Sequence, residues 1–204
     1  MQLFGMLDSP FVRRVAVSMN VLRLPFEHRP VSVHRGFDEF AQVNPVVKAP
    51  TLLTDSGVVL MDSTLILEHL ESLAPPERSL MPSEPKAREL VLRQLSLSLA
   101  ACEKAVQIVY ERTLRPAEKL HQPWLDRVER QLKAALEMLE TEIHRDPEWR
   151  SAGAMNQAEI TTAVTWRFIQ HVAPGSYAPE RFPGLAAQSA QAEAFAEFQA
   201  ADWA

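Results

Sequence analysis

The sequence predicts an α+β domain over residues 1–75, a linker over residues 76–85 and an all-helical domain over residues 86–204. Short apolar segments alternate with helical patterns in the first part, and only helical patterns follow. Between the two parts several prolines crowd together, which does not suit a regular element. A chain of 204 residues is long enough to bury the cores of two small domains.

The elements of the first domain follow from the spacing of apolar residues and from the residues that interrupt them. Asn44-Pro45 ends a short helix, because a residue before proline avoids helical backbone angles. Thr54-Asp55-Ser56-Gly57 separates two apolar segments as a hairpin turn does. The predicted strands are residues 3–6, 29–33, 51–53 and 58–60, and the predicted helices are residues 11–22, 37–43 and 63–73. The resulting order, βαβαββα, is that of a thioredoxin-like domain.

The second half contains helical stripes and no convincing strand. The stripes cover residues 91–110 and 125–143, and further helices are expected near residues 183–189 and 190–200. Residues 160–172 are apolar on nearly every side, which is typical of a helix in the middle of a domain. Asn156 and Glu159 fit a capping box that starts this helix. The single cysteine, Cys102, lies on an apolar stripe, so we expect a buried side chain and no disulfide.

Composition and charge exclude several classes of function. The net charge of −5 is spread evenly, which argues against nucleic acid or an anionic membrane surface as a partner. No apolar run approaches the ~20 residues that span a bilayer, and the N-terminus lacks the pattern of a signal peptide, so a cytoplasmic protein is expected. The six histidines lie far apart, and no metal site is predicted.

Ser9 follows the first predicted strand and opens the first predicted helix. Serine before proline is a favoured helix start, because the hydroxyl can accept an unpaired N–H of the first turn and proline has no N–H that would stay unpaired. In redox-active relatives of the thioredoxin fold this region carries Cys-X-X-Cys. Here it reads Ser9-Pro10-Phe11-Val12, which excludes disulfide exchange at this site. A serine hydroxyl at a helix N-terminus can instead donate a hydrogen bond to an external thiolate, which the helix dipole also favours.

Two further polar segments precede regular elements. Lys48-Ala49-Pro50 introduces the hairpin, and proline suits the start of an edge strand. Asp62-Ser63 precedes an apolar helix, where either residue can cap the first amides. An acid beside a helix N-terminus also provides the two opposite charges that recognise a zwitterion. Each segment therefore has a structural and a functional interpretation.

Taken together, Ser9-Pro10, residues 44–52 and residues 62–66 resemble the glutathione-binding domain of the glutathione S-transferase family, in the serine-type cytosolic form found in bacteria. The resemblance spans the whole chain, in motifs up to Leu73 and in architecture beyond it. It implies a thioredoxin-like domain followed by an all-α domain, with glutathione as a substrate. The implied chemistry is attack of the glutathione thiolate on a small apolar electrophile, with no metal.

The resemblance also assigns parts of glutathione to the first two motifs. Ser9 holds the thiolate, and Phe11 belongs to the same site. Ala49 precedes a proline, Pro50, that is cis in the family, and the Ala49 backbone forms a short ladder with the cysteinyl residue. Lys48 lies near the glycyl carboxylate.

For the γ-glutamyl group, the resemblance assigns the ammonium to Asp62 and the carboxylate to Ser63 with its backbone amide. Family members usually have glutamate where this chain has Asp62, which is one methylene shorter. They also have glycine where this chain has Val47, and often valine where it has Ala49. Val47 is therefore expected to stiffen a loop that is commonly flexible.

The remaining expectations concern the acceptor and the surface. Tyr110, Thr113 and Trp166 are candidates for an acceptor pocket, although aromatic residues at helical spacing equally suit a core. Arg13 and Arg14 are expected to form a solvated or interface-facing edge of the first helix. The resemblance implies a homodimer with a two-fold interface between the first domain of one subunit and the second domain of the other.

Two alternatives remain open. The same fold serves as a non-catalytic interaction module in regulatory and translation-associated proteins. Glutathione can also be the cofactor of an isomerase or a dehalogenase, which depends on the acceptor pocket. The set of Ser9, Pro50 and Asp62-Ser63 favours an intact glutathione site, because an interaction module does not need one. Ser18 and Ser63 are further hydroxyls that can take the part assigned to Ser9.

Overall fold

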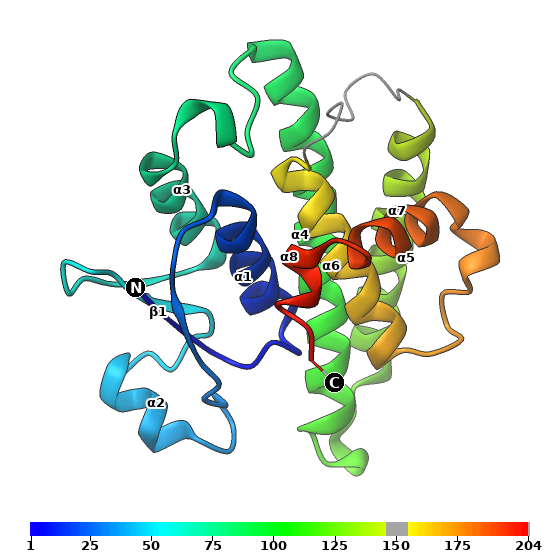
Figure 1. Cartoon of the computed structure of the whole chain (residues 1–204). Helices are drawn as coiled ribbons and strands as arrows, with labels where there is room; N and C mark the ends of the chain where they lie inside the picture. The colour runs from blue at the N-terminus through cyan, green and yellow to red at the C-terminus, as the bar shows by residue number, and fades with distance from the viewer. Residues whose placement is uncertain (146–154, 204) are drawn as a thin grey trace. The chain divides into compact units, whose positions relative to one another are not determined.

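The computed structural model describes residues 1–145 and 155–203, and it divides into two compact units (Figure 1). The first unit contains residues 1–80 together with the C-terminal segment from Glu193 onward. The second unit contains residues 81–192. The domain boundaries given above, with a linker over residues 76–85, stay a prediction.

The first unit is built on a four-stranded mixed sheet with the strand order β2-β1-β3-β4. Strand β1 runs parallel to β2, whereas β3 is antiparallel to both β1 and β4. The elements are β1 (Gln2–Phe4), α1 (Pro10–Leu22), β2 (Glu27–Arg29), α2 (Phe37–Val43), β3 (Thr51–Leu53), β4 (Val59–Met61) and α3 (Ser63–Leu73). This order confirms the predicted thioredoxin-like fold. The C-terminal segment adds a short helix, α8 (Ala196–Gln199), to the same unit.

Strand β2 departs from its predicted position. The sequence predicts a strand over residues 29–33, and the observed strand ends at Arg29. Pro30 has no N–H group to donate, so it cannot continue the hydrogen bonding of the strand. Val31 instead turns inward and packs with Phe4 and Phe40.

The two faces of the sheet carry different parts of the core, because successive side chains of a strand point to opposite faces. Leu3 and Leu52 are paired in register, and both are completely buried on one face. Phe4 points to the other face, where it packs with Phe40 of α2. Burying a large apolar side chain stabilises the fold by about 1.5–3 kcal/mol, so both faces contribute to the stability of this unit.

Arg13 and Arg14 of α1 are enclosed, which corrects the prediction of a solvated or interface-facing edge. Their exposed fractions are 0% and 1%. Arg13 donates hydrogen bonds to the Glu193 carboxylate and the Ala201 carbonyl oxygen, and Arg14 donates to the Ser63 hydroxyl. A charged side chain is buried only when such partners are present. The sequence pattern of α1 does not reveal that the C-terminal segment supplies the partners of Arg13.

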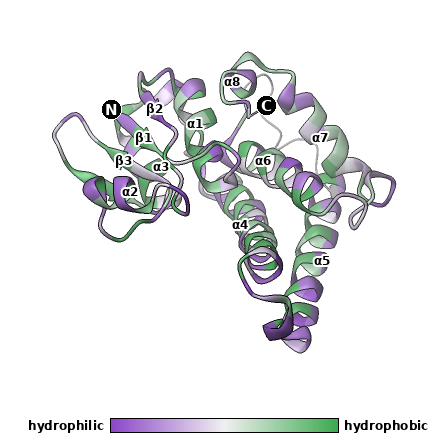
Figure 2. Cartoon of the chain, turned by 90° about the horizontal axis from the view of Figure 1, so that it is seen from below, coloured by the Kyte–Doolittle hydropathy of each residue, from purple (hydrophilic) through white to green (hydrophobic). Residues whose placement is uncertain are grey.

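The second unit is all-helical among its described residues, as the sequence predicts. Its helices are α4 (Pro85–Thr113), α5 (Gln122–Arg145), α6 (Gln157–Val172) and α7 (Pro183–Glu193). Helix α4 packs along both α5 and α6. Figure 2 shows hydrophobic and hydrophilic residues alternating along α4 and α5, as expected for helices with one apolar face. Across the described ranges, no helix combines the length and apolar character that crossing a membrane requires.

Two local predictions for the second unit are confirmed. The Asn156 side chain accepts the N–H groups of Ala158 and Glu159, and the Glu159 carboxylate accepts the N–H of Asn156 at 2.8 Å. These bonds form the predicted capping box at the start of α6. Cys102 is buried, with an exposed fraction of 1%.

Candidate functional site

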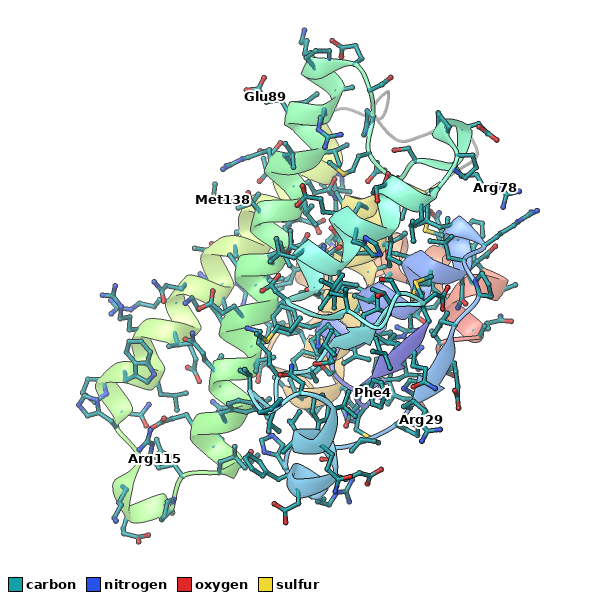
Figure 3. The ribbon with its side chains drawn as sticks, turned by 90° about the vertical axis from the view of Figure 1, so that its left-hand side faces the viewer. Phe4, Arg29, Arg78, Glu89, Arg115 and Met138 are labelled. Carbon is teal, nitrogen blue, oxygen red and sulfur yellow. The ribbon has the colours of Figure 1, made fainter. Side chains whose placement is uncertain are left out.

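The three predicted site segments leave the sheet of the first unit at one end. Phe4, the last residue of β1, is paired with Thr51, the first residue of β3. Thr51 is also paired with Met61, the last residue of β4. Figure 3 labels Phe4 and its register partner Arg29, which ends β2. The segments joined to these strand ends therefore start from a common edge, and they are residues 5–9, 47–50 and 62–63.

Gly5 allows the first two segments to approach each other. Its φ of +133° is a backbone conformation that L side chains rarely adopt. A Cβ atom at this position would lie 2.5 Å from Val12 Cγ2 and 3.1 Å from the Cβ of Ala49. The His28 ring donates a hydrogen bond from Nε2 to the Gly5 carbonyl oxygen at 2.8 Å. The end of β1 is thus fixed close to the segment that contains Ala49.

Ser9 occupies the N-cap position of α1, with extended backbone angles (φ −72°, ψ 121°) and Pro10 at the first helical position. Its carbonyl oxygen accepts the N–H of Arg13 at 2.9 Å, but its half-buried hydroxyl makes no capping hydrogen bond. Within the described residues, the hydroxyl is available to a ligand at the positive end of the helix dipole. Phe11 is half-buried in the same first turn.

The segment before β3 has an irregular backbone. The Ala49–Pro50 peptide bond is cis, the geometry that the resemblance implies. Val47 has a φ of +51°, in the left-handed region that β-branched residues avoid. The Val47 N–H donates to the Asn44 carbonyl oxygen at 2.8 Å, which holds this turn. Lys48 is exposed and, among the residues that the structure describes, forms no ion pair.

Asp62 and Ser63 form the start of α3. Asp62 has a φ of +70°, and its Oδ1 accepts the N–H of Thr64 at 2.9 Å. Ser63 is the first helical residue and is 4% exposed. The backbone N–H groups of Ser63 and Leu65 have no acceptor in the described part of the chain. Free amides and the helix dipole favour an anion here, whereas the neighbouring Asp62 carboxylate favours a cation.

Arg14 is a residue of this site that the sequence analysis missed. Its Nη1 donates to Ser63 Oγ at 2.9 Å and to Thr64 Oγ1 at 3.3 Å, which joins α1 to the first turn of α3. A signal was present in the sequence. Over residues 12–19, all residues other than the two arginines and Ser18 are apolar, and a helix of this composition is enclosed on all sides.

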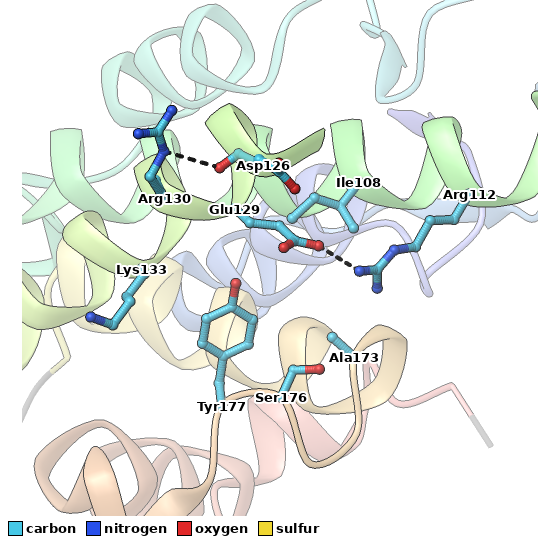
Figure 4. Close-up of a pocket in the computed structure, with 9 residues that line it drawn as sticks. All are labelled: Ile108, Arg112, Asp126, Glu129, Arg130, Lys133, Ala173, Ser176 and Tyr177. Carbon is cyan, nitrogen blue, oxygen red and sulfur yellow. Dashed lines mark hydrogen bonds and ion pairs between the residues drawn. The ribbon is translucent and has the colours of Figure 1, made fainter. Parts of the chain in front are cut away.

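The second unit carries a cavity of about 430 Å³ between α4, α5 and the segment after α6 (Figure 4). It is lined by Ile108, Arg112, Asp126, Glu129, Arg130, Lys133, Ala173, Ser176 and Tyr177. Arg112 on α4 donates to Glu129 on α5 at 2.5 Å, and Figure 4 shows the Tyr177 hydroxyl pointing toward this pair. Burial raises the pKa of the Tyr177 phenol, and the Glu129 charge acts in the same direction. The phenol therefore stays protonated at neutral pH and can donate a hydrogen bond into the cavity.

The residues predicted to bind the acceptor do not line this cavity. Trp166 lies in the core of the second unit, with its ring centroid 5.7 Å from that of Phe182. Tyr110 and Thr113 are exposed on α4. Their part in acceptor binding stays a prediction. Among the residues described by the structure, no group of three or more His, Cys, Asp or Glu side chains is arranged to hold a metal ion.

A thioredoxin-like unit with these three segments at one sheet edge, followed by an all-helical unit, has the architecture of a glutathione transferase. Residues 3–78 match the family model of the glutathione S-transferase N-terminal domain. This match, together with the relatives and solved structures described next, supports a member of the glutathione S-transferase family.

Similar proteins span nearly the whole chain. The uncharacterized GST-like protein YibF of Escherichia coli (strain K12) is 26% identical over 177 residues, which is 86% of each chain. A glutathione S-transferase of Methylobacterium radiotolerans, solved in complex with glutathione sulfonate, is 25% identical with a TM-score of 0.88 and covers 98% of this chain and 93% of its own. A glutathione transferase family member of Pseudomonas fluorescens Pf-5, solved with bound glutathione, is 26% identical with a TM-score of 0.82 and coverages of 98% and 97%.

Proposed function

We propose that this protein is a glutathione transferase that conjugates the glutathione thiolate to small apolar electrophiles. The observation that carries the proposal is that the segments of Ser9, Ala49 and Asp62-Ser63 start from one end of the sheet. In the reaction, the cysteinyl sulfur forms a bond to an electrophilic carbon, and the thiol proton passes to solvent. The carbon either releases a leaving group with its electron pair or takes the electrons into a conjugated system.

In this proposal, the γ-glutamyl α-amino acid group binds at the start of α3. Its carboxylate accepts hydrogen bonds from the N–H and hydroxyl of Ser63, where the helix dipole favours negative charge. Its ammonium pairs with the Asp62 carboxylate, of which Oδ1 already accepts the Thr64 N–H. The opposite charges of the zwitterion thus meet opposite charges at a fixed spacing, which fixes the orientation of the peptide.

The rest of glutathione follows the segment before β3. The Ala49 N–H and carbonyl pair with the cysteinyl backbone, and the Lys48 ammonium pairs with the glycyl carboxylate. The irregular backbone at Val47 and the cis bond before Pro50 shape this segment. Phe11 borders the cysteinyl side chain from the first turn of α1. Binding energy spent on orienting the peptide raises the rate at which a positioned thiolate reacts.

Ser9 is the proposed partner of the thiolate. A free cysteine thiol titrates near ~8.5, and each unit of depression corresponds to about 1.4 kcal/mol of preferential binding of the anion. A hydrogen bond from the Ser9 hydroxyl and the positive end of α1 both favour the anion. A depression of about two units, worth about 2.7 kcal/mol, ionises most of the bound thiol at neutral pH. Nucleophilic transfer requires this ionised form.

A homodimer is part of the proposal. In the first unit, β4 is an edge strand, and Val59 and Met61 on it are 42% and 38% exposed. Leu65 in the next helix is 59% exposed. Exposed apolar side chains on and beside a sheet edge favour association with a partner surface. The proposed dimer covers them with a second copy of the chain across a two-fold axis.

Calorimetric titration with glutathione tests the proposal. We expect saturable binding by the wild-type protein and its loss in the double variant Asp62→Ala, Ser63→Ala. The matched control is Asp55→Ala, Ser56→Ala, because this second Asp-Ser pair lies in the exposed β3–β4 turn of the same unit. The control variant is expected to bind glutathione like the wild type.

An electrophile screen then tests the reaction, with products identified by mass spectrometry. Conjugates that contain both glutathione and the electrophile support the proposal. The absence of saturable binding at millimolar glutathione contradicts it and favours a non-catalytic interaction module. Recovery of free glutathione with an isomerised or dehalogenated substrate favours the use of glutathione as a cofactor.

A further inference from the structure

Arg14 holds both hydroxyl groups in the first turn of α3. Its Nη1 donates to Ser63 Oγ at 2.9 Å and to Thr64 Oγ1 at 3.3 Å, and the arginine is 1% exposed. Ser18, one turn further along α1, donates its hydroxyl to the Arg14 carbonyl oxygen at 2.7 Å. The guanidinium group is therefore a permanent positive charge, shielded from water, directly behind the start of α3.

This contact determines how the Ser63 hydroxyl can be used. A guanidinium group only donates hydrogen bonds, so the Ser63 oxygen must accept the bond from Arg14. The hydroxyl proton of Ser63 then points elsewhere, and it has no acceptor within the described residues. Ser63 is only 4% exposed, so this unused donor has little access to bulk water. A buried donor without an acceptor is costly unless a ligand supplies one.

We infer that Arg14 is a positioning residue that makes the site specific for the α-carboxylate of a γ-glutamyl thiol. It fixes Ser63 as a hydrogen-bond donor and adds a buried positive charge behind the anion-binding amides of α3. The inference rests on the proposed function, because it takes the γ-glutamyl group to bind at Asp62-Ser63. It extends that function by naming the residue that discriminates peptide thiols with this carboxylate from those without it.

The neighbouring arginine provides the matched control. Arg13 lies on the same helix and is equally buried, but it is paired with the Glu193 carboxylate at 2.5 Å and 2.6 Å. No hydrogen bond joins Arg13 to Ser63 in the described part of the chain. Replacing Arg13 therefore perturbs the packing of α1 without changing the donor that faces the ligand.

The test compares two ligands that differ only at the carboxylate. One is glutathione, and the other is 4-aminobutanoyl-cysteinylglycine, which keeps the ammonium, the amides and the thiol. Dissociation constants of both are measured by calorimetry at pH 7 for the wild type, Arg14→Met, Arg14→Lys, Arg13→Met, Ser63→Ala and the double variant Arg14→Met, Ser63→Ala. The readout is the ratio of the two constants, which a general loss of folded protein does not change.

We expect Arg14→Met to weaken glutathione binding by about 10- to 100-fold, as for a lost hydrogen-bond network to a charged group, and to weaken the analogue by less than about 2-fold. Arg14→Lys, which keeps the charge, should retain part of the preference for glutathione. Arg13→Met should leave the ratio unchanged. Because Arg14 acts partly through Ser63, the double variant should lose less than the product of the two single losses.

The results that would contradict the inference about Arg14 can be told apart. Equal loss of both ligands in Arg14→Met, or an unchanged ratio, overturns the inference and leaves the proposed function intact. Strict multiplication of the two single losses in the double variant also overturns it. A wild-type protein that binds neither ligand overturns the proposed function and the inference together. If Arg14→Met is unfolded by circular dichroism, the two constants are measured for Arg14→Gln, which also removes the positive charge, and a wild-type ratio there overturns the inference.

Discussion

Replacing Glu193 with alanine should destabilise the first unit strongly, because it leaves a buried arginine without its counter-ion. Arg13 donates from Nη1 and Nη2 to the two Glu193 carboxylate oxygens at 2.5 Å and 2.6 Å. Its Nε donates to the Ala201 carbonyl oxygen at 2.9 Å, and its guanidinium lies 4.6 Å from the centroid of the Trp203 ring. The Arg13 side chain is 0% exposed and that of Glu193 is 21% exposed. The guanidinium group is therefore shielded from water completely, and the carboxylate is shielded over most of its surface.

The expected magnitude follows from this burial. Removing one partner of a buried ion pair costs about 3–5 kcal/mol, a large part of the roughly 5–15 kcal/mol that stabilises a typical domain. For a chain of this size, each kcal/mol corresponds to about 2–4 °C in the midpoint of thermal unfolding. The Glu193→Ala variant should thus melt about 6–20 °C below the wild type. Circular dichroism in the far ultraviolet and urea titration measure the change.

Two controls make this prediction specific. Glu27→Ala removes one partner of the exposed Arg29–Glu27 pair in the same unit, whose side chains are 48% and 54% exposed, and should change the melting temperature little because solvent screens an exposed pair. The double variant Arg13→Met, Glu193→Ala removes the buried charge as well. It should be more stable than Glu193→Ala alone, because an apolar side chain carries no unpaired charge. A Glu193→Ala variant as stable as Glu27→Ala, or a double variant less stable than Glu193→Ala, would refute the reasoning.

Three further predictions concern the site and the second unit. Gly5→Ala should destabilise the protein by about 2–4 kcal/mol, since a new Cβ meets Val12 at 2.5 Å on a positive-φ backbone, whereas Gly57→Ala, with open space around it, should cost about 1 kcal/mol in urea unfolding. Ser9→Ala should reduce thiolate absorbance and turnover at pH 7 about 3-fold, as for the loss of about one of the two units of pKa depression, with a small change in glutathione affinity. Two amide N–H groups at the start of α4 hold the pKa of Glu84 below its ordinary value of 4.5. Glu84→Gln should therefore lower the melting temperature at neutral pH. The difference in melting temperature between the wild type and this variant should vanish as the pH falls from 4.5 through the folded-state pKa.

Each of these three predictions can be contradicted by a specific result. Equal costs for the two glycine variants would show that the contact with Val12 is relieved by a small shift. Unchanged turnover and thiolate absorbance in Ser9→Ala would assign the thiolate to another donor. A melting difference for Glu84→Gln that persists under acid conditions would mean that the charge of the carboxylate is not what stabilises α4.

The sequence predicts local boundaries well where a residue type enforces them. Helices α2 and α3 have the predicted bounds, residues 37–43 and 63–73, because Asn44-Pro45 stops the first and Asp62 caps the second. Pro30 is such a residue too, and giving it more weight moves β2 to its observed end at Arg29. The common edge of the three site segments also follows from the strand order, once the hairpin is known to pair with β1.

The partners of the two arginines of α1 were not predictable in the same way. The partner of Arg13 is 180 residues away in sequence, and that of Arg14 is 49 residues away. Such contacts depend on how the elements pack. A local pattern of charged residues does not show which distant residue becomes the partner. The Ser9 hydroxyl illustrates a second limit, because its residue type favours a capping bond that the structure does not contain. Residue preference describes an average helix start, and the start of α1 departs from that average.

The return of the C-terminal segment to α1 makes the helical unit an insertion within the first unit. During synthesis, Arg13 emerges from the ribosome long before its partners Glu193, Phe198 and Ala201. The guanidinium group of Arg13 therefore has no carboxylate partner until the whole insertion has been made. Contacts of such sequence separation form late and slow the final folding step. A cut in the segment after Glu193 should therefore disturb the position of Ser9, which lies one turn of α1 away from Arg13 although it is distant from the cut in sequence.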